Sequence, residues 1–191
     1  MARKSDFELS IASAYRGFDR QLLLWNEKAQ GLRTVFDAND NPLDTSKLGE
    51  DELLFAILRW SALPGASRHH WGTDFDVYDR NAIPEDYQLQ LNTAESESEG
   101  VFAPLHYWLD EQIISGGSCG FFRPDTKSLE VDEVGVSAER WHLSHQSVSS
   151  CYEQQLSKEL LYYFYSSRED ILLSASIMRN FDCIFEKFIR R

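Results

Sequence analysis

The chain has few cysteines, and their spacing suits neither cross-links nor a cysteine metal site. Of 191 residues only 3 are cysteines, at positions 119, 151 and 183, and no two of them form a C-x-x-C pair. Neither a disulfide framework nor a cysteine zinc knuckle is indicated. We expect three free thiols that are buried or half-buried, as free cysteines usually are.

Long apolar runs and excess positive charge are also missing. The longest apolar run, LLFAIL at 53–58, is far too short to span a bilayer. The first residues, MARKSDFELS, lack the apolar region of a signal peptide. Lys and Arg number 19 against 31 Asp and Glu, a formal charge of −12. This charge opposes binding to nucleic acid or to an anionic membrane surface, which needs clustered cations. The sequence therefore predicts no nucleic-acid partner and no transmembrane segment.

The residues that are present suffice for one folded domain. Apolar residues make up 42% and aromatic residues 13% of the chain, as in a globular protein with a real core. No repeat or linker divides the sequence. We expect a single domain over 1–191, with its motifs in a core of about 9–145 and helices at about 151–190.

Apolar periodicity predicts strands mixed with helices, which indicates an α+β fold. Period-two alternation marks a strand at 7–13 and another at 73–78, the second with one apolar and one polar face. Helical stripes mark a helix that ends at Gly31 and helices at 51–60 and 103–114. Weaker patterns predict a hairpin about PDTK, joining FFR to SLEVDEVGV, and a short strand at 139–145.

Two histidines and two acidic residues have the composition of a catalytic metal site. His69 and Asp76 lie seven positions apart on either side of Gly72, and Glu139 precedes His142 by three. Two imidazoles and one carboxylate are the ligand set of a catalytic zinc ion that keeps one position open. Such an ion lowers the pKa of bound water to about 7, and a nearby carboxylate can then move the proton. From spacing alone a purely structural role stays open, since there is no H-E-x-x-H helix.

Three segments carry a family resemblance. SRHHWGTDFD at 67–76 resembles the S-x-H-x-x-G-x-x-x-D motif of the VanY-type D-alanyl-D-alanine carboxypeptidases, and ERWH at 139–142 resembles their E-x-W-H motif. SAYRGFDRQ at 13–21 is similar to the family's S-G-Y-R-S-x-x-x-Q. The resemblance covers roughly 9–145 and implies the fold shared with the Hedgehog signalling domain. That fold is a small antiparallel sheet that carries a zinc site and is flanked by helices.

The resemblance also implies roles for individual residues. It makes His69, Asp76 and His142 the ligands of one zinc ion per chain, and Glu139 the general base and then the general acid. These roles suit peptide hydrolysis, because the carboxylate can carry a proton from water to the leaving amine.

Substrate contacts follow from the same motifs. The resemblance implies that Arg16 stabilises the oxyanion or binds substrate, and that Ser67 contacts the peptide near its C-terminal carboxylate. An arginine fork and a hydroxyl are suited to recognising a carboxylate.

The implied activity is a zinc-dependent carboxypeptidase that removes the C-terminal D-alanine of peptidoglycan stem peptides or muropeptides. Three alternatives stay open: an L,D-carboxypeptidase, an endopeptidase on the same site, and a non-catalytic zinc-binding module of the same fold. The compartment also stays open, because the absent signal indicates the cytoplasm and the implied substrate indicates the cell envelope.

Four neighbours of these residues are harder to assign. Asp74 stands where the family motif often has alanine, and it is either a solvated carboxylate or an acid beside the site. Arg68 is either a surface ion-pair partner or an aid to carboxylate binding, and His145 is a candidate partner for the metal-site histidines. We expect His70 to make ordinary hydrogen bonds.

Overall fold

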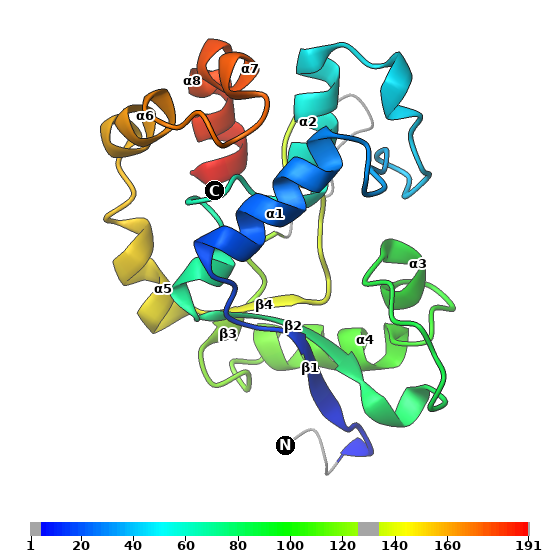
Figure 1. Ribbon diagram of the computed structural model, residues 1–191. Helices are drawn as coiled ribbons and strands as arrows, with labels where there is room; N and C mark the ends of the chain where they lie inside the picture. The colour runs from blue at the N-terminus through cyan, green and yellow to red at the C-terminus, as the bar shows by residue number, and fades with distance from the viewer. Residues whose placement is uncertain (1–4, 126–133, 191) are drawn as a thin grey trace.

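The computed structural model describes residues 5–125 and 134–190 (Figure 1). In this part of the chain, four strands form one antiparallel sheet in the order β1-β2-β4-β3. The strands are β1 Leu9–Ser13, β2 Asp74–Asp79, β3 Phe121–Phe122 and β4 His142–His145. The predicted α+β class, with a small antiparallel sheet flanked by helices, is confirmed.

The helices predicted from apolar stripes are present with closely similar bounds. They are α1 Phe18–Ala29, α2 Glu50–Trp60 and α4 Ala103–Ile114. The remaining helices are α3 Thr93–Ser96, α5 Gln146–Glu153, α6 Lys158–Ser166, α7 Ser174–Arg179 and α8 Phe181–Ile184, which continues as a π-helix over Phe185–Ile189. Across residues 5–125 and 134–190, none of these helices has both the length and the apolar character that a membrane span requires.

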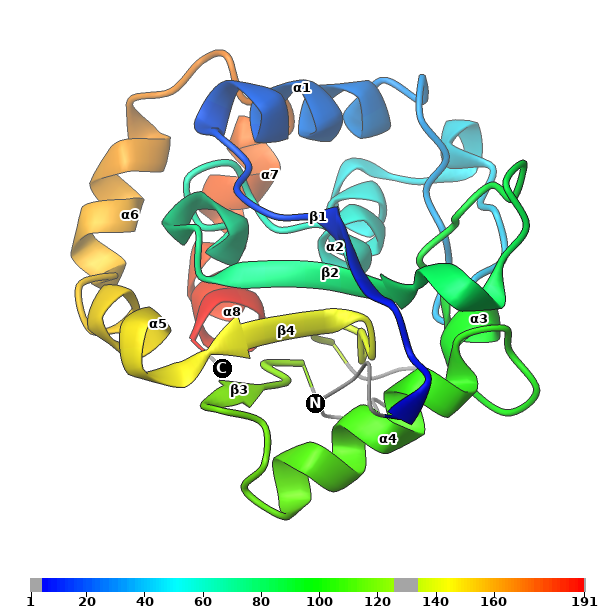
Figure 2. The same cartoon turned by 90° about the horizontal axis from the view of Figure 1, so that it is seen from below.

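The two faces of the sheet meet different surroundings. Phe75 and Val77 of β2 pack with Leu143 against Leu105 and Leu109 of α4. Side chains alternate across a strand, so the acids at positions 74 and 76 lie on the opposite face. Figures 1 and 2 show α4 on one side of the sheet and α1 and α2 on the other. The polar face of β2 therefore looks toward these helices rather than toward open solvent.

The larger core joins α1 and α2 to the C-terminal helices. Trp25, Leu54 and Ile184 have none of their surface exposed, and Phe181 is 2% exposed. The Trp25 ring nitrogen also donates a hydrogen bond of 3.0 Å to the carbonyl of Leu172. Burial of each large apolar side chain contributes about 1.5–3 kcal/mol. The C-terminal segment is thus part of the core that supports α1 and α2.

The hairpin predicted about PDTK lies partly outside the described residues, because half of its turn and most of its second strand fall within 126–133. Its first strand, β3, pairs with β4: Phe121 lies opposite His145, and Phe122 opposite Ser144. This pairing adds an edge to the sheet next to the strand that carries His142.

The three cysteines are free, but their exposure differs from the expectation. Cys119 and Cys151 are exposed, and Cys183 is partly exposed. The prediction that all three are buried or half-buried is wrong for the first two. Cys119 lies in a turn with positive φ before β3, and Cys151 lies on the outer side of α5. Isolated cysteines without apolar periodicity carry no signal of the face on which they will lie.

A glycine turn links α2 to the segment that carries Ser67 and His69. Gly65 has a φ of 96°, and a Cβ atom placed on it would lie 2.9 Å from Cε1 of Phe164 in α6. Gly72 has a φ of 70°, and its nearest neighbour would be Tyr15 at an ordinary 3.9 Å. Both glycines adopt left-handed backbone, but only Gly65 is also closely packed.

We predict that Gly65→Ala destabilises the fold more than Gly72→Ala does. Both replacements force alanine into left-handed backbone, which costs about 1–2 kcal/mol. The crowded Cβ at position 65 adds about 1–3 kcal/mol of overpacking. Urea unfolding of both variants measures the difference in the free energy of unfolding. Equal losses would mean that α6 does not restrain this turn.

Candidate active site

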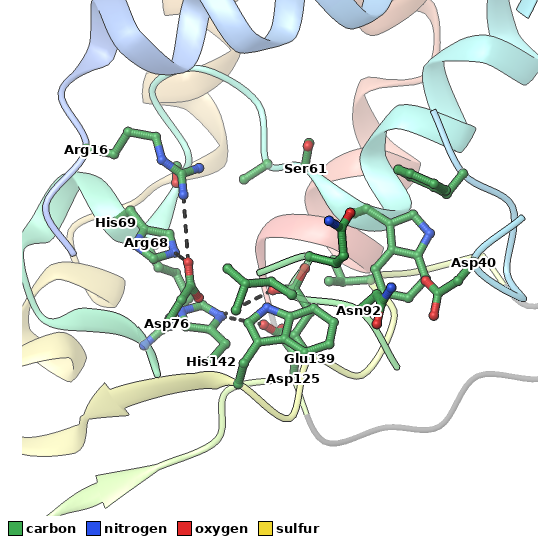
Figure 3. A pocket seen from close by; sticks show the side chains of 18 of the residues that line it. Arg16, Asp40, Ser61, Arg68, His69, Asp76, Asn92, Asp125, Glu139 and His142 are labelled. Atoms are coloured by element: carbon green, nitrogen blue, oxygen red, sulfur yellow. Dashed lines mark hydrogen bonds and ion pairs between the residues drawn. The ribbon is translucent and has the colours of Figure 1, made fainter. Parts of the chain in front are cut away.

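A cavity of about 300 Å³ opens on the polar face of the sheet, between β2, β4 and the helices α1 and α2. Its volume lies at the lower end of the range for small-molecule sites. The six residues singled out in the sequence all line it: Arg16, Ser67, His69, Asp76, Glu139 and His142. Figure 3 shows the two histidines and Asp76 converging below Arg16, with Glu139 beside His142.

Strand pairing and a short helix bring the three predicted ligands together. Asp76 of β2 lies directly opposite His142 of β4 in the antiparallel register. His69 comes from the 3-10 helix Arg68–Trp71, which ends at Gly72 just before β2. The imidazoles of His69 and His142 stack with their centres 5.0 Å apart. One possible ligand atom from each of the three residues lies within 4.8 Å of the others.

His69 is oriented by the backbone ahead of α1. Its Nδ1 lies 2.9 Å from the carbonyl of Ala14, so Nδ1 carries the proton and donates it to that oxygen. Its Nε2 then faces the cavity, 3.5 Å from Oδ2 of Asp76. Burial lowers the pKa of His69 to about 4, although the Asp76 carboxylate opposes this shift. The ring is therefore neutral at pH 7, the state in which an imidazole binds a metal ion.

His142 has carboxylates on both sides of its ring. Nε2 lies 2.9 Å from Oδ1 of Asp74, and Nδ1 lies 3.0 Å from Oδ2 of Asp125 and 3.6 Å from Oε2 of Glu139. Burial alone would lower the pKa of His142, but the hydrogen bonds to Asp74 and Glu139 raise it to about 9. A metal ion at Nδ1 would take the place of the proton there.

The residues present fit a zinc ion. Nitrogen atoms from His69 and His142 and a carboxylate oxygen from Asp76 form the donor set of a catalytic zinc site. A second group of potential ligands among the described residues consists of Asp125, Glu139 and His142. Because Nε2 of His142 is hydrogen-bonded to Asp74, Nδ1 is the nitrogen of His142 that is left to bind a metal ion in either group. The two groups are therefore alternatives for one ion.

Arg16 is fixed by the residues that its motif contains. Its guanidinium donates to Oε1 of Gln21 at 2.8 Å and to Oγ of Ser13 at 3.2 Å. Gln21 is buried and donates in turn to the carbonyl of Ala62. Nη2 of Arg16 remains 3.9 Å from Oδ2 of Asp76. The serine and the glutamine of the S-x-Y-R-x-x-x-x-Q segment thus hold the guanidinium over the candidate metal ligands.

Glu139 lies at the cavity wall, three residues before His142 and close to its ring. Burial raises the pKa of Glu139 above its ordinary value, although the neighbouring His142 opposes the shift. A carboxylate whose affinity for a proton is raised, next to a possible metal site, is suited to accept and release one.

Sequence reasoning missed part of the cavity wall, including Asp125, Lys28 and Trp60. Burial lowers the pKa of Lys28 to about 8, and its ammonium group donates to Oγ of Ser61. Trp60 stacks on Trp141 at a centroid distance of 6.5 Å. Lys28 follows Gln21 by seven residues and so lies on the same face of α1. This spacing could have identified Lys28 as a cavity residue from the sequence. Asp125 and Trp60 reach the cavity through tertiary packing that leaves no local pattern.

His70 makes ordinary hydrogen bonds, as expected. Its Nδ1 donates to the carbonyl of Arg16 at 2.5 Å, and its Nε2 accepts from the backbone N–H of Gly65 at 3.0 Å. His70 therefore ties the loop that carries His69 to the segment that carries Arg16.

The structure decides between the alternatives for Asp74, which is an acid beside the site with its Oδ1 2.9 Å from Nε2 of His142, and it does not give His145 the role of a partner to the metal-site histidines. His145 lies three positions after His142 and so faces the other side of β4, where it packs on Phe121 with ring centres 5.0 Å apart. It does not reach the candidate ligands. Asp74 is not solvated but fully buried, and Arg68 is buried beside it rather than at the surface.

The sequence of the chain matches a known protein family and is similar to that of a protein from Haemophilus influenzae. The sequence profile of the VanY family, described as D-alanyl-D-alanine carboxypeptidase, matches residues 1–148. An uncharacterized protein of Haemophilus influenzae is 32% identical over 127 residues, which are 66% of this chain and 92% of that protein.

Two solved structures are also similar. VanYB in complex with D-alanine-D-alanine has a TM-score of 0.50 and 21% identity, with 87% of this chain and 76% of that chain covered. A variant of a VanY D,D-pentapeptidase from a VanB-type resistance cassette, in complex with Zn(II), has a TM-score of 0.48 and 22% identity, with 84% of this chain and 75% of that chain covered. At these identities, the likeness to VanYB concerns the fold.

We predict that Asp76→Asn abolishes tight zinc binding, whereas Asp125→Asn retains it. The metal-free wild type should take up about one zinc ion per chain, because one histidine nitrogen serves both groups of potential ligands. Metal analysis after dialysis, with circular dichroism as the control for folding, measures the outcome. Loss of zinc in Asp125→Asn but not in Asp76→Asn would assign the ion to the other group.

Proposed function

The chain belongs to the VanY family of D-alanyl-D-alanine carboxypeptidases, and we propose that it is a zinc-dependent enzyme that removes the terminal D-alanine from peptidoglycan stem peptides. The observation that carries this proposal is the convergence of His69, Asp76, Glu139 and His142 at one cavity, below a fixed arginine. A binding module has no need of a general base beside the metal ligands, so Glu139 favours an enzyme.

In this proposal His69, Asp76 and His142 hold one zinc ion, whose chemistry is Lewis acidity that acidifies water and polarises a carbonyl group. Glu139 accepts a proton from the attacking water and returns it to the amine of the departing residue. Its position beside His142, at 3.6 Å from Nδ1, and its raised pKa support both halves of this transfer. The carbonyl carbon–nitrogen bond breaks, and the products are a free D-amino acid and a shortened peptide.

Arg16 stabilises the negative charge that develops on the scissile carbonyl oxygen. Its guanidinium is held by two hydrogen bonds, so little reorganisation is needed when that charge appears. Ser67 and Lys28 line the same cavity, and a hydroxyl and an ammonium group together suit the C-terminal carboxylate of a peptide. Trp60 and Trp141 form an apolar wall for the peptide itself.

A panel of peptides tests this function. We predict release of D-alanine from a peptide that ends in D-Ala-D-Ala, and little or none from one that ends in L-Ala-L-Ala. Product release is followed by mass spectrometry with zinc-loaded protein. Cleavage only after L-Lys or diaminopimelate would indicate L,D specificity, and cleavage inside the peptide an endopeptidase. Zinc binding without any cleavage would indicate a module that does not hydrolyse.

Glu139→Gln tests the general base. We predict that the variant binds zinc as the wild type does and loses about 10²- to 10⁴-fold in turnover, because the amide cannot accept the proton. Zinc content, melting temperature and kcat are measured on the same preparation. Turnover equal to that of the wild type would refute the role of Glu139, and loss of zinc would instead make Glu139 a ligand.

A further inference from the structure

Asp74 is a fully buried carboxylate whose two oxygens are saturated with hydrogen bonds. Its Oδ1 accepts from Nε of Arg68 at 2.8 Å and lies 2.9 Å from Nε2 of His142. Its Oδ2 accepts from the hydroxyls of Thr73 at 2.5 Å and Ser144 at 2.9 Å. Two polar neighbours on each oxygen match the lone pairs that a carboxylate offers.

The chemistry of these partners determines which nitrogen of His142 carries a proton toward Asp74. An ionised carboxylate only accepts hydrogen bonds, and an arginine beside it only donates. Nε2 of His142 must therefore donate to Asp74. The other nitrogen, Nδ1, faces the cavity, where it lies 3.0 Å from Oδ2 of Asp125 and 3.6 Å from Oε2 of Glu139.

Asp74 contacts the candidate ligand His142 but is not a candidate ligand itself. Asp74 is part of neither group of potential metal ligands found in the described ranges, although only one residue separates it from Asp76. Arg68 is itself immobilised: it donates to Ser144 at 2.8 Å and pairs with Glu153, and its guanidinium lies 4.8 Å from the centre of the Trp71 ring.

We propose that Asp74 is a positioning residue that holds His142 by its Nε2–H and presents Nδ1 to the metal ion, and that Arg68 holds Asp74 in place for this role. A carboxylate on the outer nitrogen of a ligating histidine fixes the ring and strengthens it as a donor. The inference rests on the proposed function in one respect, the assignment of His142 as a ligand. Position 74 is often alanine in the motif that this segment resembles. The hydrogen bond between His142 and Asp74 therefore depends on a residue that the motif does not require.

Asp74→Asn tests the proposal, because it keeps the shape of the side chain and removes its charge. Asp79→Asn is the matched control: Asp79 is a buried carboxylate of the same strand, and it accepts from the backbone N–H groups of Glu8 and Asn81. Zinc affinity is measured by competition with a chromophoric chelator. We expect Asp74→Asn to bind zinc about 10- to 100-fold more weakly than the wild type, and Asp79→Asn to bind it equally well.

A second readout needs no metal. In protein labelled with ¹⁵N-histidine, the Nε2–H proton of His142 should give a downfield, slowly exchanging NMR signal, as expected for a hydrogen bond to a carboxylate. This signal should shift upfield or vanish in Asp74→Asn and persist in Asp79→Asn. Unchanged zinc affinity together with an unchanged signal in Asp74→Asn would overturn the proposal.

The double variant Asp74→Ala/Arg68→Leu covers the case in which Asp74→Asn does not fold. Removing both members of a buried ion pair avoids an uncompensated charge. We expect it to fold and to show the same loss of zinc affinity. Wild-type affinity in the folded double variant would overturn the proposal.

Failure of the proposed function can be told apart from failure of this inference. If the wild type binds zinc but cleaves no peptide, the proposed function fails while the zinc measurement still tests Asp74. If the wild type binds no zinc, the NMR signal alone decides.

Discussion

The antiparallel register between β2 and β4 is the constraint on which the site depends. It places Asp76 opposite His142 and Asp74 opposite Ser144, while Phe75 and Leu143 between them face α4. A slip of one residue would turn the acids toward α4 and the apolar side chains toward the cavity. Packing of the apolar face therefore determines the position of the polar face, and the core against α4 sets the geometry of the candidate metal ligands.

Two aspartates on the same face of β2 have become chemically different. Asp74 is held by short hydrogen bonds on both oxygens. The Asp76 carboxylate meets Nε2 of His69 at 3.5 Å and Nη2 of Arg16 at 3.9 Å, distances that are long for hydrogen bonds. The oxygens of Asp74 are therefore occupied by hydrogen bonds within the protein, whereas the oxygens of Asp76 keep lone pairs that can bind a ligand. Burial is shared by both residues, so the difference comes from their neighbours rather than from depth.

Local periodicity predicted the class of the fold, and the resemblance to the family's motifs implied the set of residues that meet at the cavity. Arg16, Ser67 and Glu139 lie in short motifs, and the structure brings them to the same cavity as the histidines, where their roles remain predictions. Asp125 and Trp60 were not found, because they arrive through packing between distant segments. The alternation of β2 assigned Asp74 to a polar face but could not reveal that Arg68 lies against it.

The buried pair of Arg68 and Asp74 also has an evolutionary consequence. Losing either residue alone would break this ion pair on one side only, although Arg68 would keep Glu153 and Asp74 would keep His142, and we expect this to cost more than losing both. We therefore expect the two positions to change together more often than singly.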